Sequence, residues 1–166
     1  MNESMKHTPN PELDLLLERE VDVAPELVWR AWTTPELMLK WFTPAPWKTA
    51  EVELDLRPGG IFRTKMQGPE GEEFEGAGCV LEVVEGRKLV WTSALGPGYR
   101  PQPAGDEKGG FLFTAVISIE PSGNGTKYSA LAIHADPEGC RTHAEMGFHG
   151  GWGTALQQLV ELMKSQ

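Results

Sequence analysis

The chain has 166 residues, of which 24 are acidic and 15 are Lys or Arg, and its formal net charge is −9. This length suits one domain that buries a sizeable core. The acidic balance argues against nucleic acids and anionic membrane surfaces as partners, because both are bound through basic surfaces. The sequence also lacks an apolar run long enough to cross a bilayer and the apolar segment of an export signal, so we expect a cytoplasmic protein without membrane insertion.

Residues 1–10 are polar, and we expect them to form a disordered lead-in to a single domain over residues 11–166. The two cysteines, Cys79 and Cys140, are isolated and form no CxxC pair. In a reducing compartment such cysteines are expected to be buried free thiols rather than partners in a disulfide.

The first predicted elements are a strand and two short helices. Alternating apolar side chains predict a strand over residues 13–23. Pro25 is tolerated in the first turn of the helix that follows. Pro35 cannot continue that helix, so the helix is expected to end near Thr33 and a second short helix to begin at Pro35.

Six further strands are expected before the C-terminus. Residues 48–56 alternate cleanly between apolar and polar side chains, which predicts a half-buried antiparallel strand. The other five strands are expected over residues 61–66, 74–84, 88–94, 111–119 and 126–134. Residues 96–110 are rich in glycine and proline and are expected to form a long loop.

Helical periodicity over residues 137–164 predicts a long C-terminal helix with one apolar stripe. The stripe consists of Met146, His149, Gly153, Leu156, Val160 and Met163, widened by Trp152, Leu159 and Leu162. Glycines at 147, 150, 151 and 153 each cost a helix up to ~1 kcal/mol. We therefore expect either another backbone in close approach or space left beside this segment.

This order of elements predicts an α+β fold. A curved antiparallel sheet of about seven strands is expected to wrap around the long C-terminal helix, with the two short helices after the first strand. Side chains alone do not fill all the space in such an arrangement, so the fold favours an internal cavity, which is the default binding site.

Aromatic and histidine side chains are the best candidates for the lining of this cavity. The predicted lining consists of Trp41, Phe42, Phe62, Trp91, Phe113, His134, His149 and Trp152. Aromatic rings with a few polar groups suit a flat, largely apolar ligand. The alternative is that these rings only fill the core.

Other chemistry receives weaker support from the sequence. Arg57 and Arg63 could pair with a ligand carboxylate, although an internal ion pair or a surface position explains them more simply. The candidate metal ligands are His134, His143, Glu145 and His149. No HExxH or paired-cysteine pattern accompanies them, so we expect neither metal nor cofactor. No nucleophile elbow or phosphate-binding loop is present, and no catalytic residue is assigned.

Several motifs together resemble one known superfamily. They lie at residues 23–32, 35–42, 55–63, 89–92 and 150–152. With the order of elements they resemble the START-like superfamily, also called SRPBCC, helix-grip or birch-pollen-allergen-like. More narrowly, the chain looks like bacterial proteins with the domain named after the C-terminal half of the heat-shock chaperone ATPase activator. The resemblance extends over roughly residues 12–164 and implies a helix-grip fold.

Three functions remain open. The first is binding of a small, largely apolar ligand, aromatic or lipid-like, between the sheet and the C-terminal helix. The second, a regulator that contacts a chaperone and stimulates its ATPase, rests on the resemblance alone. The third is a cyclase- or hydrolase-type enzyme that uses the same cavity, although a non-enzymatic role is expected. The sequence does not identify the ligand, and a homodimer stays open as a further partner.

Overall fold

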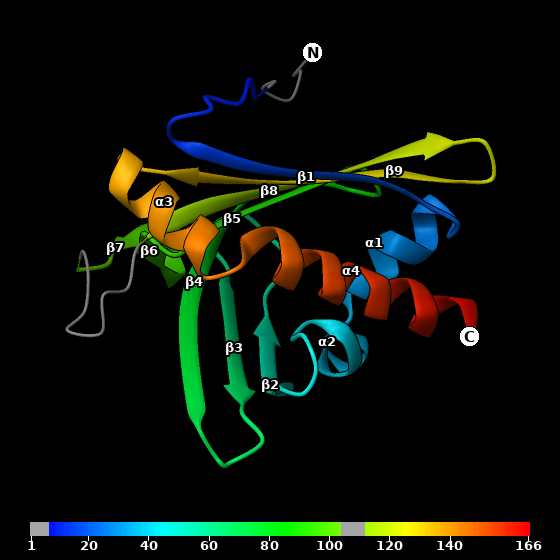
Figure 1. Ribbon diagram of the computed structural model, residues 1–166, viewed down its shortest axis with the longest axis horizontal. Coiled ribbons are helices and arrows are strands. Elements are labelled where there is room, and N and C mark those ends of the chain that lie inside the picture. The colour runs from blue at the N-terminus through cyan, green and yellow to red at the C-terminus, as the bar shows by residue number, and fades with distance from the viewer. Residues whose placement is uncertain (1–6, 104–111) are drawn as a thin grey trace.

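The computed structural model describes residues 7–103 and 112–166. A seven-stranded antiparallel sheet curves around the C-terminal helix α4 (Phe148–Lys164), and Figure 1 shows this helix lying across the inner side of the sheet. The strand order is β1-β9-β8-β5-β4-β3-β2. The predicted α+β, helix-grip fold is therefore confirmed.

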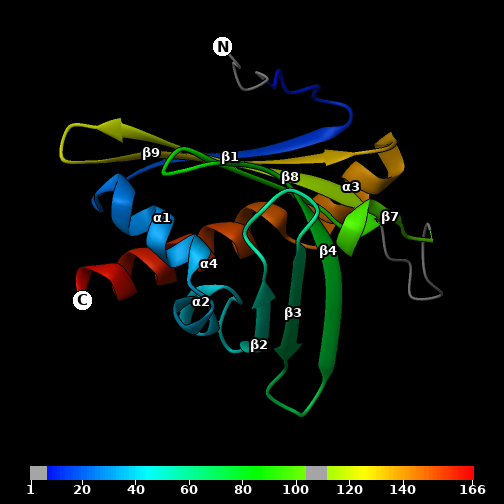
Figure 2. The same cartoon turned by 180° about the vertical axis from the view of Figure 1, so that it is seen from behind.

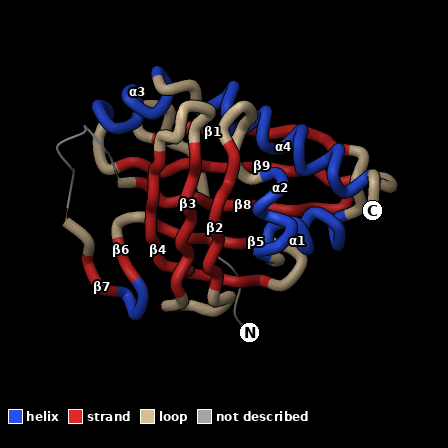
Figure 3. The backbone as a smooth tube through the Cα atoms, turned by 90° about the horizontal axis from the view of Figure 1, so that it is seen from below, coloured by secondary structure: helices blue, strands red, loops and turns tan. Residues whose placement is uncertain are grey.

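All seven strands expected from the alternation of side chains are present. They are β1 (Asp14–Val21), β2 (Lys48–Leu54), β3 (Ile61–Gln67), β4 (Glu73–Val84), β5 (Lys88–Thr92), β8 (Phe113–Ser122) and β9 (Gly125–His134). Figure 3 shows β2, β3 and β4 running across β5, β8 and β9, so the sheet is strongly bent. Gly78 of β4 permits a close approach in this region, because a Cβ there would lie 2.5 Å from the carbonyl oxygen of Thr92.

The segment expected to be a long loop contains a small second sheet. It pairs β6 (Leu95–Gly96) with β7 (Arg100–Pro101) across a single helical turn, η1 (Pro97–Tyr99). Sequence analysis missed this pairing because glycine and proline are typical of loops. The rest of that segment, together with Phe111, and residues 1–6 of the expected disordered lead-in lie outside the described residues.

The two short helices follow β1 as predicted. They are α1 (Pro25–Thr33) and α2 (Pro35–Trp41), each with proline in the first turn. Thr34 between them has φ −117° and ψ 106°, the extended backbone that a residue before proline favours. Figure 2 shows both helices beside α4, where they close the same end of the sheet.

The C-terminal helical segment differs from the single helix expected. It consists of α3 (Pro137–Glu145) and α4, separated at Met146 and Gly147. Gly147 has φ 96°, a left-handed conformation that residues with side chains rarely adopt. The backbone therefore turns at this glycine, and the helical phase begins anew at Phe148.

This break corrects the predicted apolar stripe at its first turns. Met146 is 72% exposed and His149 is exposed, whereas Phe148 is buried. Further along α4 the stripe is as predicted, with Leu156 and Val160 buried against the sheet side of the fold. The predicted stripe is thus wrong at Met146, where the helix is interrupted, and at His149 in the first turn of α4.

Candidate functional site

A continuous group of aromatic rings occupies the inner face of the sheet. At the end near α1 and α2, Trp32 contacts Trp41, Phe42 and Trp91, with ring centroids 4.9, 5.7 and 5.2 Å apart. Phe62 of β3 contacts Phe42 at 5.8 Å and Trp91 at 4.9 Å. Two helices and two strands therefore contribute rings to one contact network.

The network continues to α4. Trp152 lies parallel to Trp91, with an angle of 2° between the planes and 6.4 Å between centroids. It also contacts Phe113 of β8 at 6.1 Å and Phe148 at 4.9 Å. We call this group the aromatic cluster; it consists of Trp32, Trp41, Phe42, Phe62, Trp91, Phe113, Phe148 and Trp152.

Members of the aromatic cluster differ in exposure. Trp91 and most other members are buried, whereas Phe42, Phe113 and Trp152 are only partly buried. The helix that carries Trp152 is also open at this point, since a Cβ added at Gly150 or Gly153 would meet no atom within 4 Å. The sequence analysis offered two explanations for these glycines. At Gly150 and Gly153 the close approach of another backbone is wrong, and open space beside the helix is found.

Two histidines extend the aromatic cluster at the β8–β9 side. Nδ1 of His134 lies 2.7 Å from the carbonyl oxygen of Leu13, so this nitrogen must donate. Nε2 of His134 lies 2.9 Å from Nδ1 of His143. With both rings neutral, His143 donates from Nδ1, and its own Nε2 carries an acceptor lone pair.

The surroundings of His143 keep it neutral. Its ring lies 4.9 Å from that of Phe113 and 5.2 Å from that of Phe148. Burial, and secondly the nearby His134, lower the pKa of His143 to about 4. At neutral pH this residue is therefore a hydrogen-bonding group and not a cation.

The structure brings seven of the eight predicted lining residues together, as ring contacts link Trp41, Phe42, Phe62, Trp91, Phe113, His134 and Trp152. His149 is set apart: it is exposed, its Nε2 lies 3.2 Å from the carbonyl oxygen of Leu16, and its ring meets Phe148. The break at Gly147 explains its position, because it shifts the helical phase. Whether these residues bind a ligand stays a prediction.

Sequence analysis did not place Trp32, Phe148 or His143 in the lining. Trp32 shares a tryptophan-rich run with Trp41, and that run was the available signal. The orientations of Phe148 and His143 depend on where the last two helices separate. Their inward orientation follows from the break between those helices at Gly147.

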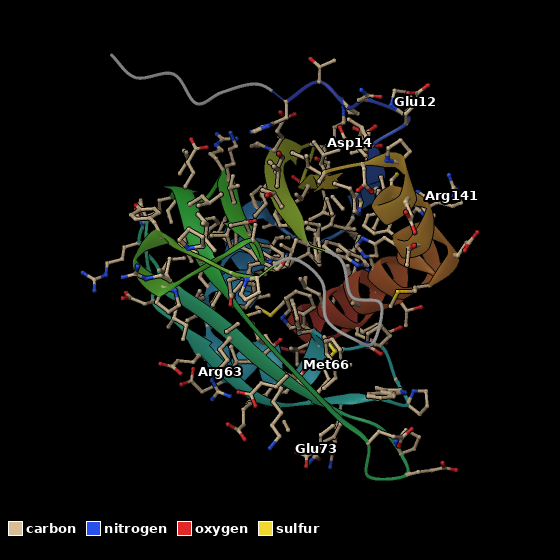
Figure 4. The ribbon with its side chains drawn as sticks, turned by 90° about the vertical axis from the view of Figure 1, so that its left-hand side faces the viewer. Glu12, Asp14, Arg63, Met66, Glu73 and Arg141 are labelled. Carbon is tan, nitrogen blue, oxygen red and sulfur yellow. The ribbon has the colours of Figure 1, made fainter. Side chains whose placement is uncertain are left out.

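The two candidate arginines form ion pairs. Arg57 lies 2.8 Å from Asp55. Arg63 pairs with Glu51, Glu53 and Glu75 at 2.9, 3.3 and 2.8 Å. Figure 4 shows Arg63 and Glu73 on the side of β3 and β4 opposite to Met66, which points toward the helices. These pairs account for both arginines without a ligand carboxylate.

Other candidate chemistry is limited in the described part of the chain. No group of three or more His, Cys, Asp or Glu residues there is arranged to hold a metal ion. Cys79 and Cys140 are free and buried, as expected. Within residues 7–103 and 112–166, no helix is long and apolar enough to span a membrane.

A shallow hollow of about 540 Å³ lies away from the aromatic cluster, between α3 and the segment that precedes β1. It is lined by Pro11, Glu12, Leu15, Pro137, Cys140, Arg141 and Ala144. Figure 4 shows Glu12, Asp14 and Arg141 gathered at this side of the molecule. The hollow offers charged groups at its rim and no aromatic ring, so it suits a flat apolar ligand less well than the aromatic cluster does.

Comparisons with known proteins agree with this architecture. The model of a family described as Activator of Hsp90 ATPase homolog 1-like protein matches residues 22–164. A crystal structure from Nitrosomonas europaea shares 49% sequence identity and a TM-score of 0.89, covering 95% of this chain and 97% of that chain. No curated protein matches the chain.

More distant structures share the fold. The AHSA1 protein from Silicibacter pomeroyi is 24% identical, with a TM-score of 0.68 over 92% of this chain and 99% of that chain. A protein from Mycobacterium smegmatis is 23% identical, with a TM-score of 0.75 over 92% of this chain and 91% of that chain. At this level of identity the likeness concerns the fold alone.

Proposed function

The chain belongs to the family of Activator of Hsp90 ATPase homolog 1-like proteins, and from this premise we propose that it binds a small, neutral, largely apolar ligand between the sheet and α4. The aromatic cluster carries the proposal. Eight rings converge on the inner face, and three of them, Phe42, Phe113 and Trp152, retain exposed surface. Flat aromatic surface of this kind binds flat ligands through stacking and edge contacts.

The ligand is expected to enter beside Trp152. The described rings contact one another, so a ligand must separate or displace some of them, and the partly buried ones cost least to move. Trp152 stands on the glycine-rich first turns of α4, where neighbouring positions have open space. This helix segment is therefore the side of the cluster that can yield most easily.

The charges of the molecule favour a neutral ligand. Among the buried residues that the structure describes, Lys88 is the one with a formal charge, and it pairs with Glu82 at 3.1 Å. Lys88 shares a face of β5 with Val90, which belongs to a separate apolar cluster, whereas Trp91 points to the opposite face. His143 is neutral, so it adds no charge at this end of the cluster.

Native mass spectrometry of freshly purified protein tests the proposal first, by detecting a small molecule that co-purifies. Binding of naphthalene derivatives, measured by calorimetry, provides the second test. We expect Trp152→Ala to weaken binding by about fivefold or more, since loss of one stacked ring is worth on the order of 1 kcal/mol or more. Arg63→Ala on the outer face is the matched control and should bind like the unaltered protein.

Two other functions would appear as distinct outcomes of these tests. Turnover of a bound compound would indicate the enzyme hypothesis. Stimulation of a chaperone ATPase, together with the absence of any co-purified or added ligand, would favour the chaperone hypothesis that the family description suggests. Failure of every naphthalene probe to bind, with no co-purified molecule, would refute the proposed function.

A further inference from the structure

Two neighbouring tryptophans on the inner side of the fold differ in how their indole N–H groups are satisfied. Trp41 Nε1 donates to the carbonyl oxygen of Ala31 at 3.0 Å. Trp32 is 3% exposed, and its Nε1 is buried without a hydrogen-bond partner among the described residues. The two rings lie only 4.9 Å apart, centroid to centroid.

An unpaired buried donor is unusual. Most buried polar groups in folded proteins have a partner, and leaving one without costs about 1–3 kcal/mol. Trp32 is buried, so solvent does not satisfy its N–H. A phenylalanine in its place would keep most of the ring contacts while lacking the N–H. Among the described residues, the indole N–H therefore has no well-formed hydrogen bond.

The phenol of Tyr128 is the polar side chain associated with this nitrogen. Tyr128 lies on β9, is 3% exposed, and belongs to the same core as Trp32. Burial raises the pKa of Tyr128, and a hydrogen-bonding interaction from the Trp32 indole N–H, whose geometry is incomplete, partly opposes this effect. The phenol is therefore protonated at neutral pH and is a second donor beside the indole, although the two groups do not meet in a well-formed hydrogen bond.

We propose that Trp32 Nε1 and the Tyr128 hydroxyl form a two-donor site for a neutral acceptor oxygen of the bound molecule, such as a ketone or ether oxygen. The inference rests on the proposed function and specifies its ligand: a largely aromatic molecule with an acceptor oxygen at its buried end. A carboxylate is disfavoured, because the inner face described above offers it no cation. Two neutral donors instead suit a neutral oxygen.

Two probes of similar shape test the inference: 2-acetylnaphthalene, which has a ketone oxygen, and 2-isopropylnaphthalene, which has none. We expect the unaltered protein to bind the ketone roughly three- to tenfold more tightly relative to the hydrocarbon, after correction for their different transfer from water, as suits one or two neutral hydrogen bonds. In Trp32→Phe this preference should disappear, and in Tyr128→Phe it should shrink.

Trp41→Phe is the matched control. Trp41 belongs to the aromatic cluster, so Trp41→Phe should lower stability and change the affinity for both probes. It removes an indole N–H that already has a protein partner, so the ratio of the two affinities should be kept. Trp32→Phe removes an unpaired donor and should lower stability less. The opposite pattern, with the preference retained in Trp32→Phe or lost only in Trp41→Phe, would overturn the inference.

A measurement on the unaltered protein covers the case in which Trp32→Phe fails to fold. The indole N–H proton resonances of Trp32 and Trp41 can be compared before and after addition of 2-acetylnaphthalene. The Trp32 resonance should move downfield on hydrogen bonding, and that of Trp41 should move less. Binding of both probes without this shift contradicts the two-donor site, whereas binding of neither probe contradicts the proposed function itself.

Discussion

The two faces of strand β3 show opposite ways of handling polar groups. On the outer face Arg63 and Lys65 pair with carboxylates, and the hydrogen bonds that Arg63 donates to Glu51 and two further glutamates raise the pKa of Arg63. On the inner face Phe62 joins the aromatic cluster. The outer charges satisfy one another in contact with solvent. The inner face holds few polar groups. Each of them therefore restricts the chemistry of a ligand in the cluster more than a polar group on the outer face does.

The strongest test of this contrast is Trp91→Ala on the inner face. Trp91 is 7% exposed and contacts rings from α1, β3 and α4. We expect the free energy of unfolding to fall by about 3–5 kcal/mol, the cost of removing a large buried aromatic side chain. Urea unfolding followed by circular dichroism measures it.

Arg63→Ala is the matched substitution on the outer face of the neighbouring strands. Its effect should be much smaller and should shrink further with added salt, because solvent screens exposed ion pairs. If Trp91→Ala cost as little as Arg63→Ala, Trp91 would border an open cavity instead of packed core. The inner face would then lack the tight packing that distinguishes it from the outer face.

The second test concerns His143 and uses pH. Its folded pKa of about 4 lies below the ordinary value of 6.5, so the unfolded chain binds the proton more readily. The contribution of a neutral His143 is complete above about pH 6.5 and is lost as the pH falls toward 4. The slope is at most about 1.4 kcal/mol per pH unit, and the total loss is about 3 kcal/mol at most.

A variant isolates this effect from the titration of carboxylates in the same range. His143→Gln keeps an amide donor for His134 but does not titrate. The difference in unfolding free energy between the two proteins should narrow from neutral to acidic pH. A difference that stays constant over this range would mean that His143 is not held neutral by the inner face.

Much of the fold could be predicted because its signals are local. Alternation over residues 48–56 needed only a side-chain period of two, and the prolines at 25 and 35 mark the starts of α1 and α2. Phe62 and Trp91 were placed in the lining from the inner face of the predicted sheet, and Trp41 from the second short helix. The sequence was sufficient where one residue's direction follows from that of its neighbours.

The rest depended on geometry that no local pattern carries. Gly147 breaks the last helical segment, and beyond this left-handed residue Phe148 is buried while His149, expected in the lining, is exposed. The bond between His134 and His143 joins a strand to a helix. The missing partner of Trp32 could not be predicted either, because a donor is unpaired only with respect to a complete three-dimensional environment.

The smallest expected effects come from a pair of glycines at the edge of the aromatic cluster, Gly147 and Gly150. Alanine at 147 must adopt φ 96°, which costs a residue with a Cβ about 1–2 kcal/mol. Alanine at 150 lies inside α4 with no atom within 4 Å of its Cβ, and it should stabilise the protein by up to ~1 kcal/mol. Thermal unfolding of the two variants should therefore shift in opposite directions.

Ligand binding by Gly150→Ala then tests whether the first turns of α4 must yield when a ligand binds. Gly150 lies on the exposed side of α4, so its added methyl group does not enter the cluster. If probes enter beside Trp152, the stiffer turn should yield less easily, and affinity should fall although stability rises. A variant that is both more stable and equal in affinity would show that this glycine serves neither packing nor binding. The ligand would then have to enter nearer Phe42 or Phe113, the other partly exposed rings.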